Sequence, residues 1–181
     1  MSVKESDIIK QLADPAAQQT GFALLVRQYS EPLYWKIRHF VLTHEDADDV
    51  LQNTFLKAWL NLDKFKGDSK ISTWLFRIAI NESLDFLRRQ KAAQRSGFEG
   101  DLSLAERLVA DDYFDGNEAQ ALLQEAIAQL PEVQRAVFNL RYFDDMKYTE
   151  ISELLGTSVG ALKSSYHIAA QKVAEYLRSK D

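Results

Sequence analysis

A polar stripe at helical spacing lies between residues 77 and 88, and its side chains are of the kinds that bind nucleic acid. Its members recur at steps of four, four and three: Arg77, Asn81, Asp85 and Arg88. Guanidinium groups can hold phosphates while an amide reads a base edge. The preceding loop could contact an unstacked strand through stacking and backbone groups, at Phe65, Lys66, Gly67, Asp68 and Ser69. An exposed polar stripe beside a surface loop is the alternative that these residues leave open.

Residues 149–178 have the pattern of a helix-turn-helix. A two-turn apolar segment is followed by Gly156, which tolerates the left-handed conformation that closes a helix, and Ser158 is a good N-cap for the next one. One stripe of the second helix is apolar, at Leu162, Tyr166, Ala169, Val173 and Leu177. The polar side chains that remain outward near its beginning, where a recognition helix contacts bases, are Lys163, Ser164 and His167. An ordinary helical hairpin has the same spacing.

A third candidate surface lies on a predicted helix over residues 45–62. One face is apolar, whereas the other mixes an acid, amides and leucines at helical spacing: Asp49, Gln52, Asn53, Leu56 and Leu60. Exposed leucines can anchor a partner helix while polar residues fix its register. A solvated face with two surface leucines explains the pattern equally well.

The residue types that catalysis or metal binding needs are scarce. The chain has no cysteine, which excludes a disulfide scaffold and a thiolate site and fits a reducing cytosol. None of the three histidines, His39, His44 and His167, has ligand spacing to another or to a glutamate motif. We therefore expect no enzyme activity, no metal and no cofactor. No apolar run approaches the length of a membrane span, so membrane insertion is not expected and the expected location is cytoplasmic.

Charge is distributed unevenly along the 181 residues, whose net charge is −5. Residues 97–130 carry 1 Lys/Arg against 8 Asp/Glu, whereas residues 20–96 carry 12 against 9 and residues 131–181 carry 7 against 7. The acidic excess is therefore central, and the flanking segments are neutral to basic. Overall charge affects solubility and steering, and it does not exclude nucleic-acid binding by one face.

Helical periodicity extends through the chain and predicts an all-α fold of two small domains. Helices are expected near residues 8–12, 22–29, 30–42, 45–62, 71–90, 118–129, 131–143, 149–155 and 159–178, with a break at Ser30-Glu31-Pro32 and a loop over 63–70. Residues 92–116 contain glycines and many acids and have weak periodicity, which predicts a flexible acidic linker. The expected domains are 1–91 and 117–181.

Several segments, taken together and in order, resemble the extracytoplasmic-function (ECF) subfamily of RNA polymerase sigma factors. Residues 46–59, 65–69, 73–81 and 85–89 are similar to conserved region two, a helical bundle. Residues 130–143, 148–151 and 156–164 are similar to region four, a helix-turn-helix domain.

The resemblance implies a sigma factor that binds core RNA polymerase and promoter DNA. The face with Asp49, Gln52 and Asn53 would dock on the clamp helices of polymerase. The predicted helix over 71–90 and the loop over 65–73 would open the minus-ten element and capture a flipped base, with Asn81 beside that pocket. The linker would pass near the active site and RNA exit, and region four would bind the minus-thirty-five element, where Arg141 takes the place of a DNA-contacting arginine.

Two departures from the family pattern affect the upstream element and regulation. Ala161 and Ser165 stand where the family often has threonine and arginine, and Ile168 and Ala170 replace other frequent basic residues. Fewer phosphate contacts are therefore expected from this helix. The chain has no long C-terminal extension, so an anti-sigma factor would be a separate protein.

Two other classes of binding protein remain possible on the sequence. A stand-alone helix-turn-helix regulator would account for residues 148–178 but not for the face with Asp49 or the stripe with Asn81. A degenerate polymerase-binding adaptor would retain the docking face and lack DNA opening.

Overall fold

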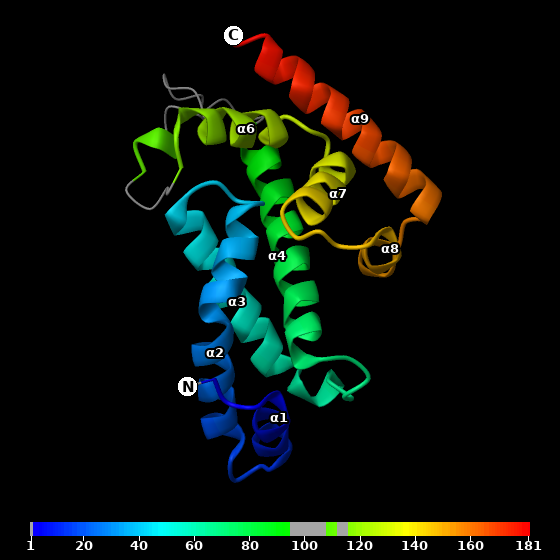
Figure 1. The fold of residues 1–181 in the computed structure, drawn as a ribbon. Coiled ribbons are helices and arrows are strands. Elements are labelled where there is room, and N and C mark those ends of the chain that lie inside the picture. Colours follow the sequence, from blue (N-terminus) through cyan, green and yellow to red (C-terminus); the bar gives the residue numbers. More distant parts are fainter. Residues whose placement is uncertain (1, 95–107, 112–115) are drawn as a thin grey trace. The chain divides into compact units, whose positions relative to one another are not determined.

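The structure, a computed structural model, describes residues 2–94, 108–111 and 116–181. Those residues form helices and contain no strand, which confirms the predicted all-α class (Figure 1). In chain order the elements are α1 (Glu5–Ala13), α2 (Gln18–Arg38), α3 (His44–Leu60), the 3-10 turn η1 (Leu62–Lys64), α4 (Ile71–Gln94), α6 (Glu118–Ala128), α7 (Glu132–Tyr142), α8 (Tyr148–Leu155) and α9 (Val159–Arg178). Most of the predicted linker, at residues 95–107 and 112–115, lies outside the described residues.

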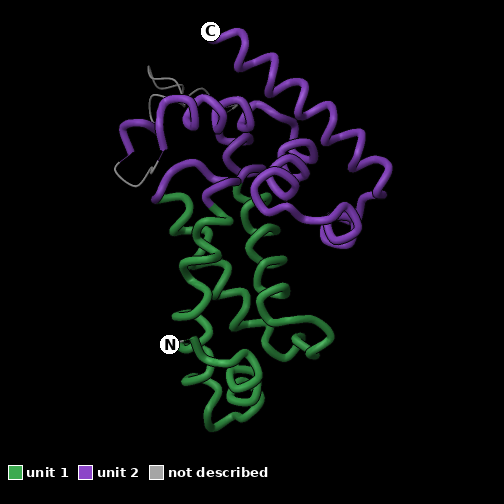
Figure 2. The backbone as a smooth tube through the Cα atoms, viewed as in Figure 1, with its two compact units in different colours: residues 1–37, 45–86 green, residues 38–44, 87–181 purple. Residues whose placement is uncertain are grey.

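The chain divides into two compact units (Figure 2). Unit 1 comprises residues 1–37 and 45–86, and unit 2 comprises residues 38–44 and 87–181. The last part of α4 and the segment after α2 therefore group with the C-terminal helices.

Unit 1 is a helical bundle whose core comes from the apolar faces of α2, α3 and α4. Leu25, Leu33 and Ile37 of α2 are buried, and they lie at steps of eight and four along one side of that helix. The ring of Phe22 packs edge-on against Phe55 and Trp59 of α3, with centroids 6.4 and 5.0 Å away. The apolar face predicted for α3 is buried, at Val50 and Ala58 among others, and α4 buries Leu75 and Ala79. This packing fixes the outer faces of both helices.

The predicted break at Ser30-Glu31-Pro32 is wrong, because α2 continues through Pro32 to Arg38. Proline in a helix interior costs about 3 kcal/mol, because it lacks a donor and crowds the carbonyl four residues earlier. Burying Leu33 and Ile37 along the same stripe as Leu25 contributes roughly 1.5–3 kcal/mol for each side chain. The apolar contacts therefore outweigh the local cost, and Pro32 itself is exposed.

Several predicted boundaries also differ from the observed ones. The helix that was expected to reach residue 42 ends at Arg38, and α3 ends at Leu60, two residues before the predicted end. The turn η1 follows at Leu62–Lys64 and overlaps the start of the predicted loop. α4 is longer than predicted, since it continues to Gln94. The long, mostly polar end of α4 has few apolar residues that could signal its helical state in the sequence.

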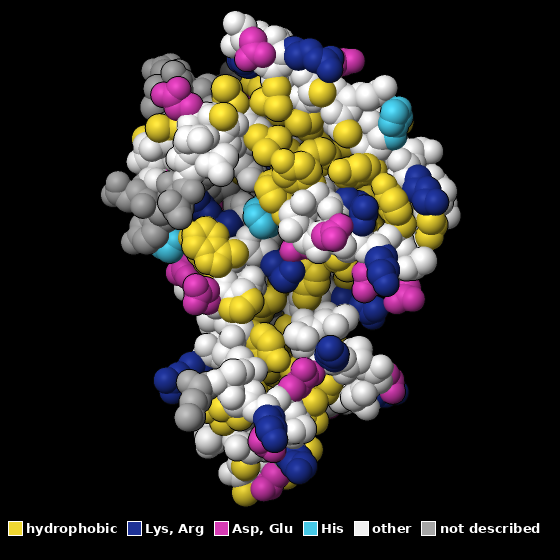
Figure 3. Space-filling model, viewed as in Figure 1, with side chains coloured by type: hydrophobic (Ala, Val, Ile, Leu, Met, Phe, Trp, Pro, Cys, Tyr) yellow, Lys and Arg dark blue, Asp and Glu magenta, His cyan; other side chains and the backbone are white. Residues whose placement is uncertain are grey.

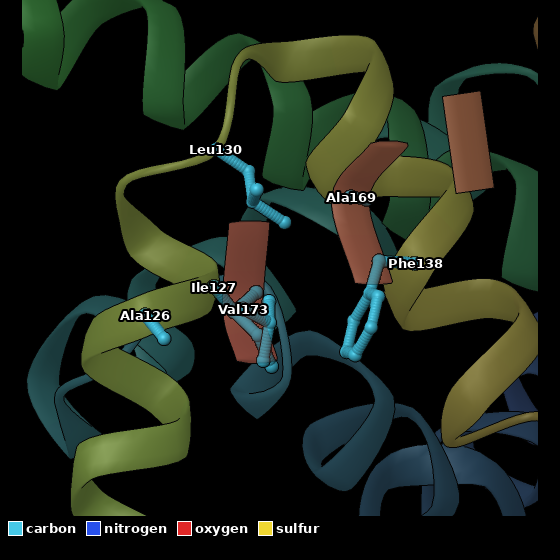
Figure 4. Close-up of a cluster of buried hydrophobic side chains, with 6 residues drawn as sticks. All are labelled: Ala126, Ile127, Leu130, Phe138, Ala169 and Val173. Carbon is cyan, nitrogen blue, oxygen red and sulfur yellow. The ribbon is translucent and has the colours of Figure 1, made fainter. Parts of the chain in front are cut away.

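Unit 2 has its own apolar core between α6, α7 and α9. Side chains from these helices and from Leu130, between α6 and α7, converge in Figure 4: Ala126, Ile127, Leu130, Phe138, Ala169 and Val173. The predicted buried stripe of α9 is thus confirmed, with Leu162 and Ala169 fully buried and Val173 nearly so. This packing fixes which side of α9 faces solvent.

Buried polar groups hold the segment after α2 inside unit 2. Arg135 Nη2 donates to the carbonyl of Phe40 at 3.0 Å, and Asn139 Nδ2 donates to the carbonyl of His39 at 2.9 Å. Both side chains belong to α7, and the ring of Phe143 stacks on His39 with centroids 4.0 Å apart. Burial lowers the pKa of the Arg135 guanidinium to about 10, because a low-dielectric site disfavours its charged form. These bonds satisfy carbonyls that follow the end of α2 and lack helical partners.

Candidate nucleic-acid and partner-binding surfaces

The polar stripe of α4 is presented outward as predicted. Arg77 and Asn81 are exposed and Asp85 is half-buried, while Leu75 and Ala79 on the other side of the helix are buried. Asn81 therefore offers an amide with one acceptor oxygen and two donor hydrogens to an external ligand. An exposed amide beside a cation suits a base edge next to a phosphate.

An ion pair between a buried carboxylate and a largely exposed lysine fixes the rotation of α4 that exposes Asn81. The carboxylate of the next residue, Glu82, is almost fully buried and accepts a hydrogen bond from Lys57 Nζ of α3. Because consecutive side chains on a helix point about 100° apart, Glu82 packed against α3 turns Asn81 toward solvent. A buried carboxylate that loses its partner is strongly disfavoured, so the pair resists rotation of the helix.

Arg88, at the far end of the stripe, has a protein partner. Its Nη2 forms an ion pair with Glu132 of α7, and both residues belong to unit 2. Binding of a phosphate by Arg88 would require that pair to open. Since both side chains are substantially exposed, such a pair is weak, of order 0–1 kcal/mol, and opening it costs little.

The loop before α4 presents an exposed run that includes the predicted Lys66, Gly67, Asp68 and Ser69 and continues through Lys70. Gly67 has a φ of 78°, a left-handed conformation that a residue with a Cβ adopts at a cost. Phe65 differs from the others, because it is half-buried and its ring lies 5.3 Å from that of Trp74. Phe65 thus anchors the loop on α4 while keeping part of its ring exposed.

The mixed face of α3 is exposed along its whole length. Asp49, Gln52 and Asn53 are exposed, and Gln52 Nε2 donates to Asp48 Oδ2 at 3.3 Å. Leu56 and Leu60 are 56% and 66% exposed, one helical turn apart. Two adjacent exposed leucines beside an amide-rich surface form the pattern of an anchor with polar surroundings.

In the C-terminal module the structure confirms the predicted helix-turn-helix caps. Gly156 ends α8 with a φ of 65°, and Ser158 Oγ accepts from Ala161 N at 3.2 Å at the start of α9. Lys163, Ser164 and His167 are all exposed on the first turns of α9. Figure 3 shows Lys and Arg side chains among acidic ones over α8 and the beginning of α9.

Arg141, in the last turn of α7, contacts the turn that leads into α8. Its Nη1 donates to the carbonyl of Met146 at 2.6 Å and lies 3.6 Å from Asp145 Oδ1. The guanidinium carbon is also 4.8 Å from the centre of the Tyr148 ring. Asp145 has a φ of 48°, so this cation supports a strained turn between α7 and α8. Arg141 therefore has a structural contact in addition to the DNA contact that was predicted.

The aromatic ring of Tyr148 was not singled out on the sequence, and it links Arg141 to Lys163. Lys163 Nζ lies 5.9 Å from the centre of this ring, within the range of a cation–π contact. No local spacing predicts this arrangement, because Tyr148 begins α8 and Lys163 belongs to α9. Glu82 was missed for a similar reason, since only its partner on α3 distinguishes it from an exposed glutamate.

Two searches of the described residues give negative results. No group of histidine, aspartate and glutamate side chains there could hold a metal ion. No described helix has the length and apolar character needed to span a membrane.

Two family models match the chain. Sigma-70 region 2 matches residues 25–93, which include α3, α4 and the loop between them. Sigma-70 region 4 matches residues 120–173, which include the helix-turn-helix of α8 and α9. The candidate surfaces described above lie within these two matches, which define the class as sigma-70 proteins.

Relatives from several bacteria are similar over most of their length. The ECF RNA polymerase sigma factor SigW of Bacillus subtilis is 32% identical over 170 residues, covering 88% of this chain and 90% of the relative. The RNA polymerase sigma-H factor of Pseudomonas aeruginosa is 33% identical, covering 87% and 86%. The ECF RNA polymerase sigma-E factor of Escherichia coli K12 is 30% identical, covering 86% and 85%. The chain belongs to the ECF subfamily of RNA polymerase sigma factors, proteins that direct promoter-specific transcription initiation.

Solved structures agree with this fold. CnrH, solved in complex with the cytosolic domain of CnrY, is 26% identical with a TM-score of 0.67, covering 98% of this chain and 96% of that one. The sigma factor RpoE of Bartonella quintana, solved in complex with the anti-sigma factor NepR, is 22% identical with a TM-score of 0.66, covering 87% and 96%. The likeness to RpoE, at 22% identity, supports the fold alone.

Proposed function

We propose that the two matched regions carry three binding surfaces. One docks on core polymerase, one opens the minus-ten element and one reads the minus-thirty-five element. Residues 1–91 would dock on core polymerase through Asp49, Gln52, Asn53 and Leu56 and would open the minus-ten element. Residues 117–181 would read the minus-thirty-five element, and residues 92–116 would link the two modules. The observation that carries the proposal is the outward placement of each predicted surface on a helix whose opposite face is buried.

For DNA opening we propose a division of labour on and before α4. Arg77, and Arg88 once its ion pair opens, would hold phosphates, while Asn81 would pair with an unstacked base. Residues 65–69 would follow the displaced strand, with the exposed part of Phe65 available for stacking. The protein would act by binding alone, so we propose that it is not an enzyme.

The proposed regulation and cellular location of this chain are argued from two partners, an anti-sigma factor and RNA polymerase. Two similar proteins were solved in complexes, one with the cytosolic domain of CnrY and the other with the anti-sigma factor NepR. We propose that a separate anti-sigma factor likewise binds this chain. Since its working partner is RNA polymerase, we propose a cytoplasmic location.

Reconstitution with core RNA polymerase tests the proposed function. The chain should co-purify with core enzyme and should direct initiation from a defined set of fragments in a genomic library. The adaptor hypothesis predicts co-purification without initiation. The absence of both activities would contradict the proposal.

The isolated chain is expected to bind promoter duplex weakly. Its net charge is −5, and neutralisation of phosphates by cations supplies most of the affinity for duplex DNA. Duplex titration of the free chain and of the holoenzyme at physiological salt measures the difference. Nanomolar binding by the free chain would instead favour the stand-alone regulator.

Lys163→Ala is expected to lower the salt dependence of polymerase–promoter binding. Lys163 is exposed in the first turns of α9, and loss of one phosphate contact reduces the slope of log affinity against log salt by about one. Transcription from promoters that depend on the minus-thirty-five element should fall as well. Arg141→Ala should have both effects, and it should also loosen the turn at Met146.

Two matched variants control for charge and for position on α9. Lys180→Ala removes the same charge just beyond the far end of α9, and it should leave the slope unchanged. Ser165→Ala should have little effect, because Ser165 is half-buried, whereas Ser165→Arg should strengthen binding with some loss of discrimination. If Lys163→Ala and Arg141→Ala both keep the wild-type slope and promoter choice, α9 is not the upstream reader.

A further inference from the structure

The amino end of α4 lacks a cap of its own. The N-cap position is Lys70, whose carbonyl accepts from Trp74 N at 3.1 Å. A lysine side chain has no acceptor, and the first turn of α4 contains no acidic residue. The first amide of the helix belongs to Ile71, which is fully buried, so water is a poor substitute partner.

A carboxylate from α1 supplies the missing acceptor. Glu5 Oε1 accepts from the backbone N–H of Ile71 at 2.6 Å, across 66 residues of sequence. The bond is charge-assisted and lies at the positive end of the α4 dipole, where an anion is favoured. Burial raises the pKa of the Tyr29 hydroxyl on α2, and the negative charge of Glu5 raises it further.

α1 is held closely enough to place this carboxylate. Ile8 and Leu12 are buried in unit 1. A Cβ at Gly21 of α2 would lie 2.7 Å from Gln11 Cβ, so the two helices approach at a distance that only glycine allows. Val3 N donates to Gln28 Oε1 at 3.0 Å, which fixes the beginning of the segment.

We propose that Glu5 is a positioning residue for promoter opening, which it supports by capping α4 and holding the loop over residues 65–70 that leads into this helix. The inference rests on the proposed role of that loop and goes beyond it, because α1 lies before the segment matched by sigma-70 region 2, which begins at residue 25. Without the cap, the first turn of α4 frays and the loop loses its fixed end. Binding of the unstacked strand then requires the loop to be ordered again.

The test compares Glu5→Ala with the wild-type chain in the reconstituted holoenzyme. The probe is a pre-melted promoter chosen from the fragments that the wild-type holoenzyme transcribes. Glu5→Ala should bind the pre-melted minus-ten segment about threefold or more weakly, as expected for loss of a cap. Association with core polymerase and the salt slope of upstream binding should stay at wild-type values, which a general loss of folded protein would not allow.

Three further variants make the result specific. Glu5→Gln keeps an acceptor oxygen and should recover part of the binding. Asp7→Ala removes an exposed acid from the same turn of α1 and should behave as wild type. Gly21→Ala keeps Glu5 but pushes α1 away, so it should reproduce the defect of Glu5→Ala.

Two results would overturn the inference. One is wild-type binding of the pre-melted segment by Glu5→Ala, and the other is a Glu5→Gln variant as defective as Glu5→Ala. Failure of the proposed function is a separate result, since the wild-type holoenzyme itself would then transcribe no promoter.

Discussion

The double variant Asp49→Arg, Gln52→Ala is expected to bind core polymerase at least about tenfold more weakly than the wild-type chain, a loss of about 1.4 kcal/mol. Both side chains are exposed on α3 beside Leu56, which is 56% exposed. An arginine in place of the acid reverses a charge at the centre of the proposed interface, and like-charge or unpaired contacts there are costly. Affinity is measured by titrating labelled chain with core enzyme.

The fold of this variant should be unaffected, because α3 packs through Val50, Phe55 and Ala58 on its other side. The matched control is Glu31→Arg with Gln19→Ala, which makes the same charge change and amide loss at exposed positions of α2. The control should bind core enzyme normally. If the folded Asp49 variant binds as tightly as the control, the docking surface lies elsewhere on the chain.

The sequence predicted those parts of the fold that depend on local spacing. The apolar stripe of α9 and the caps at Gly156 and Ser158 are confirmed, because periodicity and capping involve residues within a few turns of one another. The outward position of Asn81 was predictable for the same reason. Asn81 lies away from the buried side of α4, where Leu75 and Ala79 pack, so its side chain points to solvent.

Local signals failed where distant contacts decide the structure. Pro32 predicts a helix start, yet α2 passes through it because Leu33 and Ile37 are buried in the same core as Leu25. The bond from Ile71 to Glu5 joins residues 66 positions apart, and the bond from Arg135 to Phe40 joins residues 95 apart. No spacing rule connects such pairs, so each polar member was indistinguishable from a solvated one.

Site residues with two roles were the hardest to predict. The resemblance assigns Arg141 to DNA, while the structure also ties its guanidinium to Met146 and Tyr148. The stripe of α4 likewise includes Arg88, which pairs with Glu132. A sequence pattern identifies a cation at a helical position, but its partners depend on elements that come later in the chain.

Asn81→Ala is expected to impair opening of the minus-ten element more than binding of the upstream element. Loss of one amide–base contact costs about 1–3 kcal/mol, or roughly fivefold to 150-fold in the rate of open-complex formation. The measurement compares transcription from a duplex promoter and from the same promoter pre-melted over the minus-ten element. If Asn81 pairs with the unstacked base, pre-melting should relieve only part of the defect, since the base still lacks its partner.

The control for this prediction removes an amide from the opposite side of the same helix. Gln90 is exposed and lies nine residues after Asn81, about half a turn around α4, so Gln90→Ala should transcribe both templates normally. Full rescue of Asn81→Ala by pre-melting would mean that the amide helps to separate the strands without holding the base afterwards. Unchanged transcription from both templates would remove Asn81 from the site. Because Glu82 remains paired with Lys57 in the variant, a loss confined to DNA opening can be assigned to the amide rather than to rotation of α4.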